Sequence, residues 1–411
     1  MKMNKRFIGL LAGMALFGSC HVNAVLAEPM PNEQLNQLAE EAVAKKPYAV
    51  GYPVNQNLML RDFYDWFIKT GLCNVCMNNV GDPFDPHIAL SNSLNFEREV
   101  IEFFAPLYGF TKDNVWGIMS MSGTDGNNHG IYFGHNYLEA VTKQEPIMYV
   151  STESHYSNKR LADLQNIEVR LIECDKFGAM LPEAFKKAFD PTRPALVVFS
   201  MGTTFKGGID DQPTINKIID DMNPVAVYRH VDAALFGGYL PYTELKELVD
   251  RNVCRYDSIA ISGHKFFGMD EPCGLFLTTK DVLAKQNSYD TPYLNGAMPM
   301  INCSRSALQP LKMYWLINEY GKEGYEADTK KMLENAQYLH KRMTEAGWPA
   351  WLGKGSNTVF FKRPSDKVMD KYGLCPEYDD RFGGNLAHMI VMQHVEKAII
   401  DEFVNDINSL K

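Results

Sequence analysis

The chain has 411 residues, of which 45% are hydrophobic and 12% aromatic, and its formal net charge at pH 7 is −9. This composition can bury a substantial core, so we expect no long disordered segment away from the termini. The acidic balance and the lack of a long basic run argue against a nucleic-acid-binding protein. The length favours one large and one small domain.

The N-terminus predicts a signal peptide over residues 1–27. Lys2, Lys5 and Arg6 precede an apolar run, residues 7–20, that is too short to span a bilayer comfortably, and small residues end at Ala27. We expect cleavage, export to the periplasm and no stable membrane insertion afterwards. A lipid-attached Cys20 and an uncleaved anchor are alternatives.

Cys73 and Cys76 form a single C-x-x-C pair in the N-terminal arm that we expect over residues 28–95. No second pair completes a zinc site, so no metal site is expected. In an oxidising compartment the two residues could form a local disulfide or remain free thiols. A redox function built on this pair is a remote alternative, because the strand–helix context for it is missing.

Strands and helices alternate along the middle of the chain, residues 96–295, after helices expected at 32–44, 60–68 and 96–108. Predicted strands cover 117–121, 147–151, 169–173, 196–201, 227–232, 258–262 and an antiparallel 275–278. Predicted helices cover 124–140, 156–164, 181–189, 214–222 and 243–249. This alternation is typical of an α/β domain with a mostly parallel seven-stranded sheet between helical layers.

Residues 296–411 predict a smaller α+β domain at the C-terminus. Helices are expected at 307–320, 325–346 and 396–407, and strands at 358–361 and 387–392. The methionines of the second helix recur at helical spacing, which favours a core position over a metal site.

The motifs that carry chemistry follow the predicted strands, and in parallel sheets ligands bind at the carboxyl ends of strands. Ser122, Gly123 and Thr124 follow the first strand and open a helix. Small residues and unpaired N–H groups at a helix N-terminus suit a phosphate, although an ordinary strand–turn–helix junction uses the same residues.

Two further loops carry polar side chains in the same position. His155 follows the strand 147–151, where it could stack on a flat heteroaromatic ring, donate a proton, or simply begin a helix. Thr204, in Gly202-Thr203-Thr204, could reach a phenolic oxygen or a carboxylate, or cap its own loop.

Asp232 ends a buried strand and is followed by two alanines. A carboxylate in such a place is unfavourable without a partner, and a protonated pyridine nitrogen is a suitable one. Ala234 is small enough to lie flat against the ring. A structural aspartate bonded to loop N–H groups is the alternative.

Lys265 follows the strand 258–262 in the segment Ser262-Gly263-His264-Lys265-Phe266-Phe267. Apolar surroundings favour the neutral amine, which can attack an aldehyde. Ser262 and His264 would suit a phosphate beside it. A surface lysine that closes a strand is the alternative for this residue taken alone.

These motifs, in this order and spacing, resemble the pyridoxal-phosphate-dependent group II amino-acid decarboxylases, over roughly residues 48–405. Within that group the chain is most similar to the bacterial histidine decarboxylases and the plant serine decarboxylases, which share Pro272-Cys273-Gly274 and Ser304-Arg305. The resemblance implies an aspartate-aminotransferase-like fold, pyridoxal 5′-phosphate as cofactor, and a homodimer whose active sites are completed across the interface.

The resemblance also implies roles for individual residues. Lys265 would bond covalently to the cofactor, Asp232 would pair with its ring nitrogen, and His155 would stack on the ring opposite Ala234. The phosphate would be held by Ser122, Gly123, Thr124, Ser262 and His264, and Thr204 would lie near the ring oxygen or the substrate carboxylate. Ser304, Arg305 and His155 would contact the substrate, and His155 or a tyrosine would return a proton to the alpha carbon.

L-Histidine is therefore the leading substrate, with serine or another small or apolar amino acid as the alternative. Two departures from the family pattern bear on this choice: Ser306-Ala307-Leu308 replaces the usual Asn-Gly-His, and Asp270-Glu271 replaces small or apolar residues. A transaminase, a different lyase, or an exported non-catalytic protein that kept the fold and the cofactor would share the same cofactor residues.

Overall fold

The computed structural model describes residues 32–86, 89–294 and 296–409, and the chain divides after Lys46 into two compact units. Of the first unit the structure describes helix α2 (Glu33–Lys45), which Asn32 caps by accepting a hydrogen bond from the Gln34 N–H. The helix predicted at 32–44 is therefore present. The predicted signal peptide and Cys20 lie outside the described residues.

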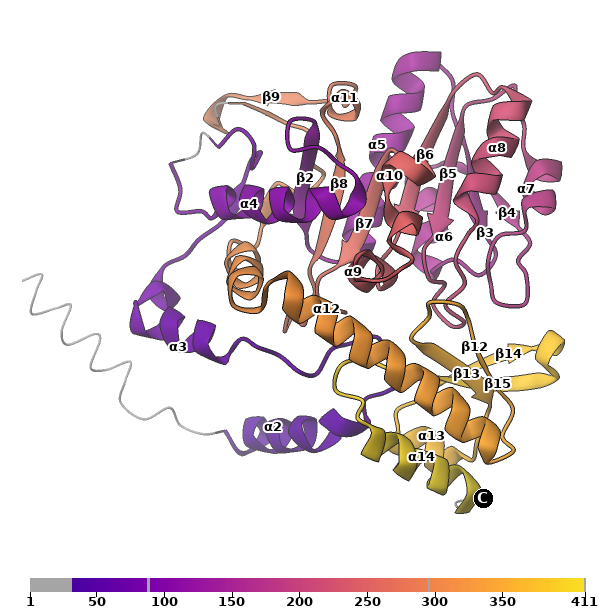
Figure 1. Ribbon diagram of the computed structural model, residues 1–411. Helices are drawn as coiled ribbons and strands as arrows, with labels where there is room; N and C mark the ends of the chain where they lie inside the picture. The colour runs from indigo at the N-terminus through magenta and orange to yellow at the C-terminus, as the bar shows by residue number, and fades with distance from the viewer. Residues whose placement is uncertain (1–31, 87–88, 295, 410–411) are drawn as a thin grey trace, which may run out of the picture. The chain divides into compact units, whose positions relative to one another are not determined.

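The second unit, residues 47–411, is built on a sheet of seven strands in the order β2-β8-β7-β6-β5-β3-β4 (Figure 1). Its strands are β2 (Val115–Ser120), β3 (Ile147–Ser151), β4 (Glu168–Ile172), β5 (Ala195–Ser200), β6 (Val227–Asp232), β7 (Ser258–Ser262) and β8 (Gly274–Thr279). Strands β3 to β7 pair in parallel, whereas β8 is antiparallel to both β2 and β7. The mostly parallel seven-stranded sheet and its antiparallel strand are thus confirmed.

Helices cover both faces of this sheet, because successive side chains of each buried strand enter different apolar clusters. Helices α4 (Leu94–Phe104), α7 (Pro182–Ala188) and α8 (Gln212–Met222) pack in one cluster, with Tyr149 and Val197 of the sheet. Helices α5 (Gly123–Thr142) and α6 (Tyr156–Leu164) pack in the other, with Met148 and Val198. This is the α/β architecture expected from the sequence.

A second sheet, in the order β12-β13-β15-β14, is antiparallel throughout. Its strands are β12 (Ala350–Leu352), β13 (Thr358–Lys362), β14 (Cys375–Asp379) and β15 (Gly384–Ile390), and α13 (Asp366–Lys371) and α14 (Lys397–Ser409) accompany it. Its core includes Val50 from the N-terminal arm and Phe361 and Phe403 from the C-terminal part. The arm therefore contributes to the small sheet's core.

Helix α12 (Leu308–Glu345) belongs to both cores. Leu311, Met313 and Leu316 pack in the core of the large sheet, whereas Leu339 and Met343 pack with the small sheet. The helix is interrupted at residue 321, a glycine with φ 65° and ψ −175°, which accounts for the two helices predicted here.

Helix α3 (Arg61–Lys69) confirms the helix predicted at 60–68. The other short elements were not predicted. They are α9 (Phe236–Tyr239), α10 (Arg251–Cys254), α11 (Lys280–Leu283), and the paired strands β1 (Asn79–Val80) with β11 (Ser304–Arg305) and β9 (Tyr289–Thr291) with β10 (Gly296–Met298). The helix predicted at 243–249 is wrong, because only a 3₁₀ turn, Lys246–Val249, forms there. Two-residue and three-residue strands carry too little alternation to be recognised.

Within the described ranges, every helix is too short or too polar to cross a bilayer. In the same ranges Cys73 and Cys76 are free, exposed thiols.

Candidate active site

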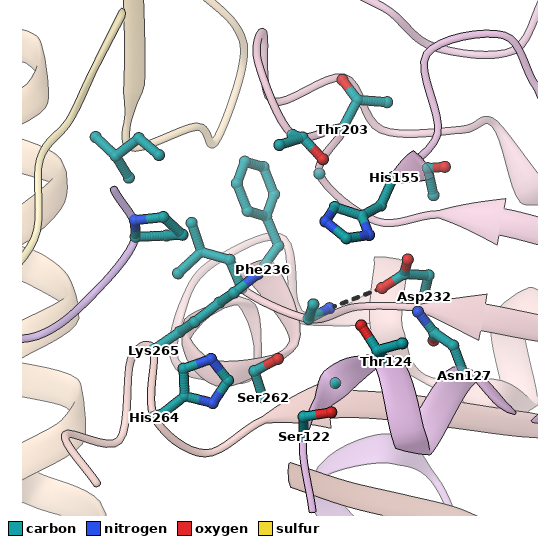
Figure 2. Close-up of a pocket in the computed structure, with 18 of the residues that line it drawn as sticks. Ser122, Thr124, Asn127, His155, Thr203, Asp232, Phe236, Ser262, His264 and Lys265 are labelled. Atoms are coloured by element: carbon teal, nitrogen blue, oxygen red, sulfur yellow. Dashed lines mark hydrogen bonds between the residues drawn. The ribbon is translucent and has the colours of Figure 1, made fainter. Parts of the chain in front are cut away.

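A cavity of about 290 Å³ lies at the carboxyl ends of β5, β6 and β7 (Figure 2). Ten of the predicted site residues line it: Ser122, Gly123, Thr124, His155, Thr204, Asp232, Ala234, Ser262, His264 and Lys265. The parallel strands bring these residues together from segments far apart in the sequence, because their carboxyl ends share one edge of the sheet.

Lys265 stands three residues after β7, and its side chain extends into the cavity (Figure 2). Its backbone carbonyl accepts a hydrogen bond from the Asn55 N–H at 3.3 Å, but in the described part of the chain Nζ makes none. Burial lowers the pKa of the Lys265 amine, and the nearby Asp232 charge opposes this shift only in part. The site therefore favours a neutral, nucleophilic amine.

Asp232 is the last residue of β6, and both of its carboxylate oxygens accept hydrogen bonds from neutral donors. The Asn158 amide donates to Oδ2 at 3.0 Å, and the Ala234 N–H donates to Oδ1 at 3.3 Å. The side chain reaches the cavity wall while only 7% of the residue is exposed. A cation entering the cavity would thus meet an oriented carboxylate.

His155 caps helix α6, and its Nδ1 lies 2.6 Å from Ser157 Oγ. Burial lowers the pKa of His155, the Asp232 charge opposes the shift, and the Lys265 charge adds to it. The imidazole is therefore favoured in its neutral form, in which it can stack against a flat ring.

The end of the cavity opposite His155 is rich in hydrogen-bond donors for an anion (Figure 2). Ser122 caps α5 by accepting the Asp125 N–H at 3.1 Å, so this end contains the helix N-terminus. A Cβ at Gly123 would lie 2.2 Å from Ser262 Oγ, so a larger residue here would displace the Ser262 hydroxyl from this end of the cavity. Thr124 and His264 complete the donors here.

The side chains of the cavity match pyridoxal 5′-phosphate group by group. They offer a neutral amine for its aldehyde, a carboxylate for its ring nitrogen, and hydroxyls at a helix N-terminus for its phosphate. The side chains present therefore fit the cofactor.

Comparison with known proteins also indicates an enzyme that uses pyridoxal phosphate. The conserved domain of the pyridoxal-dependent decarboxylases matches residues 133–348. A histidine decarboxylase from Solanum lycopersicum is 31% identical over 91% of this chain and 87% of its own length, and serine decarboxylase 1 from Oryza sativa subsp. japonica is 31% identical over 89% and 73%. The chain belongs to the pyridoxal-dependent decarboxylase family. It is a carboxy-lyase of amino acids that uses pyridoxal 5′-phosphate.

Solved structures share the fold of this decarboxylase. L-Methionine decarboxylase from Streptomyces sp. 590, complexed with L-methionine methyl ester, covers 94% of this chain and 97% of its own at a TM-score of 0.79 and 20% identity. Glutamate decarboxylase from Lactobacillus brevis gives a TM-score of 0.75 at 17% identity over 93% and 92% of the two chains.

Sequence reasoning missed part of the decarboxylase's cavity wall. Asn127 belongs to the motif at the start of α5, so its position could have been inferred, whereas Pro53, Thr358 and Ile390 come from the arm and the small sheet. These three carry no local signal, because only the tertiary packing brings them to the large sheet.

Ser304 and Arg305, predicted to contact the substrate, do not lie on this cavity wall within the described chain. Arg305 forms a buried ion pair with Glu97 at 2.9 Å and donates to the Gly81 carbonyl at 3.2 Å. Ser304 is exposed, and its Oγ accepts from the Asn78 amide at 3.0 Å. Both residues lie on β11, which pairs with β1 rather than with the large sheet.

The acids after the lysine also have structural partners. Lys312 on α12 donates to Asp270 at 2.8 Å and to Glu271 at 3.2 Å, and Tyr64 donates to Asp270 as well. Ser306, at the other departure from the family pattern, accepts from the Gln309 N–H at the start of α12. Neither departure lines the cavity.

A charge cluster joins two cavity loops to the small sheet. The buried Lys206 donates to Glu153 at 2.8 Å and to Asp379 at 2.6 Å, and Arg381 pairs with both acids. Glu153 lies two residues before His155, and Lys206 two residues after Thr204. The cluster therefore fixes these loops relative to β14.

Proposed function

We propose that this decarboxylase converts L-histidine to histamine and carbon dioxide. The observation that carries the proposal is the likeness to histidine decarboxylases from distant sources. The histidine decarboxylase from Mesorhizobium japonicum is 29% identical over 93% of this chain and 99% of its own length, and the one from Solanum lycopersicum is 31% identical.

In this proposal the side chains of the cavity divide the work. Lys265 supplies the amine that holds the cofactor aldehyde, and Asp232 pairs with the ring nitrogen. His155 and Ala234, which both line the cavity, would hold the ring between them. Ser122, Gly123, Thr124, Ser262 and His264 bind the phosphate, and Thr204 contacts the ring oxygen or the substrate carboxylate.

The bound cofactor supplies an electron sink for the bond broken to carbon dioxide. The protein orients the amino acid and keeps water away from the alpha carbon. Burial lowers the pKa of His155, so its protonated form gives up a proton more readily and could return one to the alpha carbon; a tyrosine is the second candidate.

Serine is the second candidate substrate, because serine decarboxylases 1 and 3 of Oryza sativa subsp. japonica are each 31% identical to this chain. Histidine requires room for an imidazole and a donor or acceptor for its ring nitrogens, whereas serine requires a partner for one hydroxyl. Thr203 and Tyr156 line the cavity and carry hydroxyls that could meet either need.

We also propose a homodimer and an exported, periplasmic protein. The family resemblance supports the dimer, and the basic, apolar and small-residue succession over residues 1–27 supports export. Sedimentation of the mature protein tests the first proposal. Fractionation of cells expressing the full chain tests the second, and N-terminal sequencing locates the cleavage site.

The substrate proposal is tested by incubating the purified protein and cofactor with each of the common amino acids. Carbon dioxide and the amine are measured together, and keto acid is measured to separate decarboxylation from transamination. We expect histamine and carbon dioxide in equal amounts from histidine, and at least about tenfold lower kcat/KM for serine. A higher kcat/KM for serine than for histidine contradicts the proposal.

A further inference from the structure

We infer that Asn158 is a positioning residue that holds the Asp232 carboxylate toward the cofactor's ring nitrogen. The inference rests on the role proposed above for Asp232. It adds a residue on helix α6 that contributes to the cofactor site without lining the cavity.

The contact is direct and fully buried. Asn158 has no exposed surface, and its Nδ2 donates to Asp232 Oδ2 at 3.0 Å. The other oxygen, Oδ1, accepts from the Ala234 N–H at the longer distance of 3.3 Å. Two hydrogen bonds therefore restrain the rotation of the carboxylate, and the one from the Asn158 amide is the shorter.

The two donors are neutral, and this matters for the partner that Asp232 can take. In the described residues no lysine, arginine or histidine forms an ion pair with Asp232, whereas Glu97 and Asp379 are each paired with a buried cation. Neutral donors stabilise the carboxylate without cancelling its charge. Among the described residues Asp232 is thus without an ion-pair partner, which leaves its side chain available to a protonated ring nitrogen.

Packing alone does not explain an asparagine at this position. Its other polar atom, Oδ1, is buried and has no hydrogen-bond partner within the described chain, which is unfavourable. Its neighbours on α6, Leu161 and Ala162, pack in an apolar cluster. An aliphatic side chain would satisfy such surroundings better, so the amide's contact with Asp232 is the interaction that accounts for it.

The position on α6 links the two groups that would meet the ring. His155 caps this helix, and the Asn158 N–H donates to the His155 carbonyl at 3.0 Å. The first turn of α6 therefore carries the imidazole and the amide that orients Asp232. A substitution that removes the side-chain amide of Asn158 would disturb the Asp232 carboxylate but would keep the hydrogen bond from the residue 158 N–H to the His155 carbonyl.

The test compares three variants of the full-length chain, Asn158→Leu, Asn158→Asp and, as a matched control, Asn335→Leu. Asn335 is also buried, and its amide donates to the Val395 carbonyl at 2.9 Å in the small sheet's region. The measurements are the Kd of the apoprotein for pyridoxal phosphate, the melting temperature of the apoprotein, and kcat and KM for the amino acid found to be the substrate.

We expect Asn158→Leu to raise the Kd about tenfold, as for the loss of a hydrogen bond to a charged group, and to lower kcat with KM within about twofold. Asn158→Asp keeps the shape but places a second carboxylate beside Asp232, so its Kd should rise further. Asn335→Leu should lower the melting temperature without changing the Kd.

An unchanged Kd in both Asn158 variants, or equal changes in Asn158→Leu and Asn335→Leu, would overturn the inference. Asp232→Asn, measured beside them, separates the two levels of the argument. If Asp232→Asn also leaves the Kd unchanged, the role proposed for Asp232 fails and the inference fails with it. If Asp232→Asn weakens binding and the Asn158 variants do not, only the inference fails.

Discussion

Two lysines, the half-buried Lys265 after β7 and the buried Lys312 on α12, have surroundings that give them opposite properties. Lys265 enters the cavity, and burial lowers the pKa of its amine. Lys312 is 2% exposed, and burial alone would lower its pKa too, but hydrogen bonds to Asp270 and Tyr64 and the charges of Asp270 and Glu271 raise it.

The difference shows what separates a reactive lysine from a structural one in this decarboxylase. Burial acts to lower the pKa of both amines, so it does not decide; the presence of hydrogen-bonded acids does. Arg305 and Glu97 repeat the structural arrangement, with both side chains only 1% exposed. The predictions below test how burial and charged partners act on these residues and on one buried histidine.

The largest effect is expected for Lys265→Ala. Without the amine, amine production should fall by at least about 10³-fold, the scale of losing a covalent catalyst. The free energy of unfolding of the apoprotein should change little, because Nζ makes no hydrogen bond within the described residues. Product formation and urea unfolding measure the two quantities, and retained activity would contradict the role of Lys265.

Arg305→Leu should mainly reduce stability, in contrast to Lys265→Ala, which should mainly reduce activity. It leaves Glu97 buried without its cation, which costs about 3–5 kcal/mol of unfolding free energy. The double variant Arg305→Leu/Glu97→Leu should recover part of this loss. If Arg305→Leu is as stable as the native chain but has a raised KM, Arg305 contacts the substrate as the sequence predicted.

Acid should destabilise the protein through His230, a buried base whose two ring nitrogens contact the neutral side chains of Ser258 and Asn127. Burial lowers its pKa from 6.5 to about 4, and it contacts Asn127 and Ser258. Because the unfolded chain binds this proton more readily, stability should fall by about 3 kcal/mol as the pH drops from about 6.5 to about 4. Urea unfolding across this range should show a flatter profile for His230→Gln than for the native chain.

Lys312→Met should produce the smallest effect of the four. Asp270 and Glu271 are partly exposed, at 22% and 44% of their side chains, so water can solvate them when the cation is removed. We expect a loss of about 1–3 kcal/mol in urea unfolding, with the cofactor's absorbance unchanged. A lost absorbance band in a folded variant would mean that Lys312, not Lys265, carries the cofactor.

The parts of the molecule that were predictable are those with local signals. The strands 147–151 and 258–262 were predicted with their observed bounds, since both are buried parallel strands with mostly apolar sequences. The motifs after them came together because parallel strands end at one edge of the sheet.

The parts that were missed depend on long-range packing. Arg305 was predicted to bind substrate, yet its partner Glu97 lies 208 residues earlier and gives no sign of the pairing in the sequence. Thr358 and Ile390 reach the cavity from the small sheet, and Asn158 contacts Asp232 from 74 residues away. No local sequence pattern indicates these contacts between residues far apart in the chain.

The most direct test of the central claim is to load the protein with pyridoxal phosphate, reduce it with borohydride, digest it and map the modified peptide. Reduction fixes the cofactor on whichever lysine had bonded to its aldehyde. We expect the phosphopyridoxyl mass on the peptide that contains Lys265 and on no other. Modification of Lys312 or Lys206 instead, or no modified peptide at all, would contradict the claim.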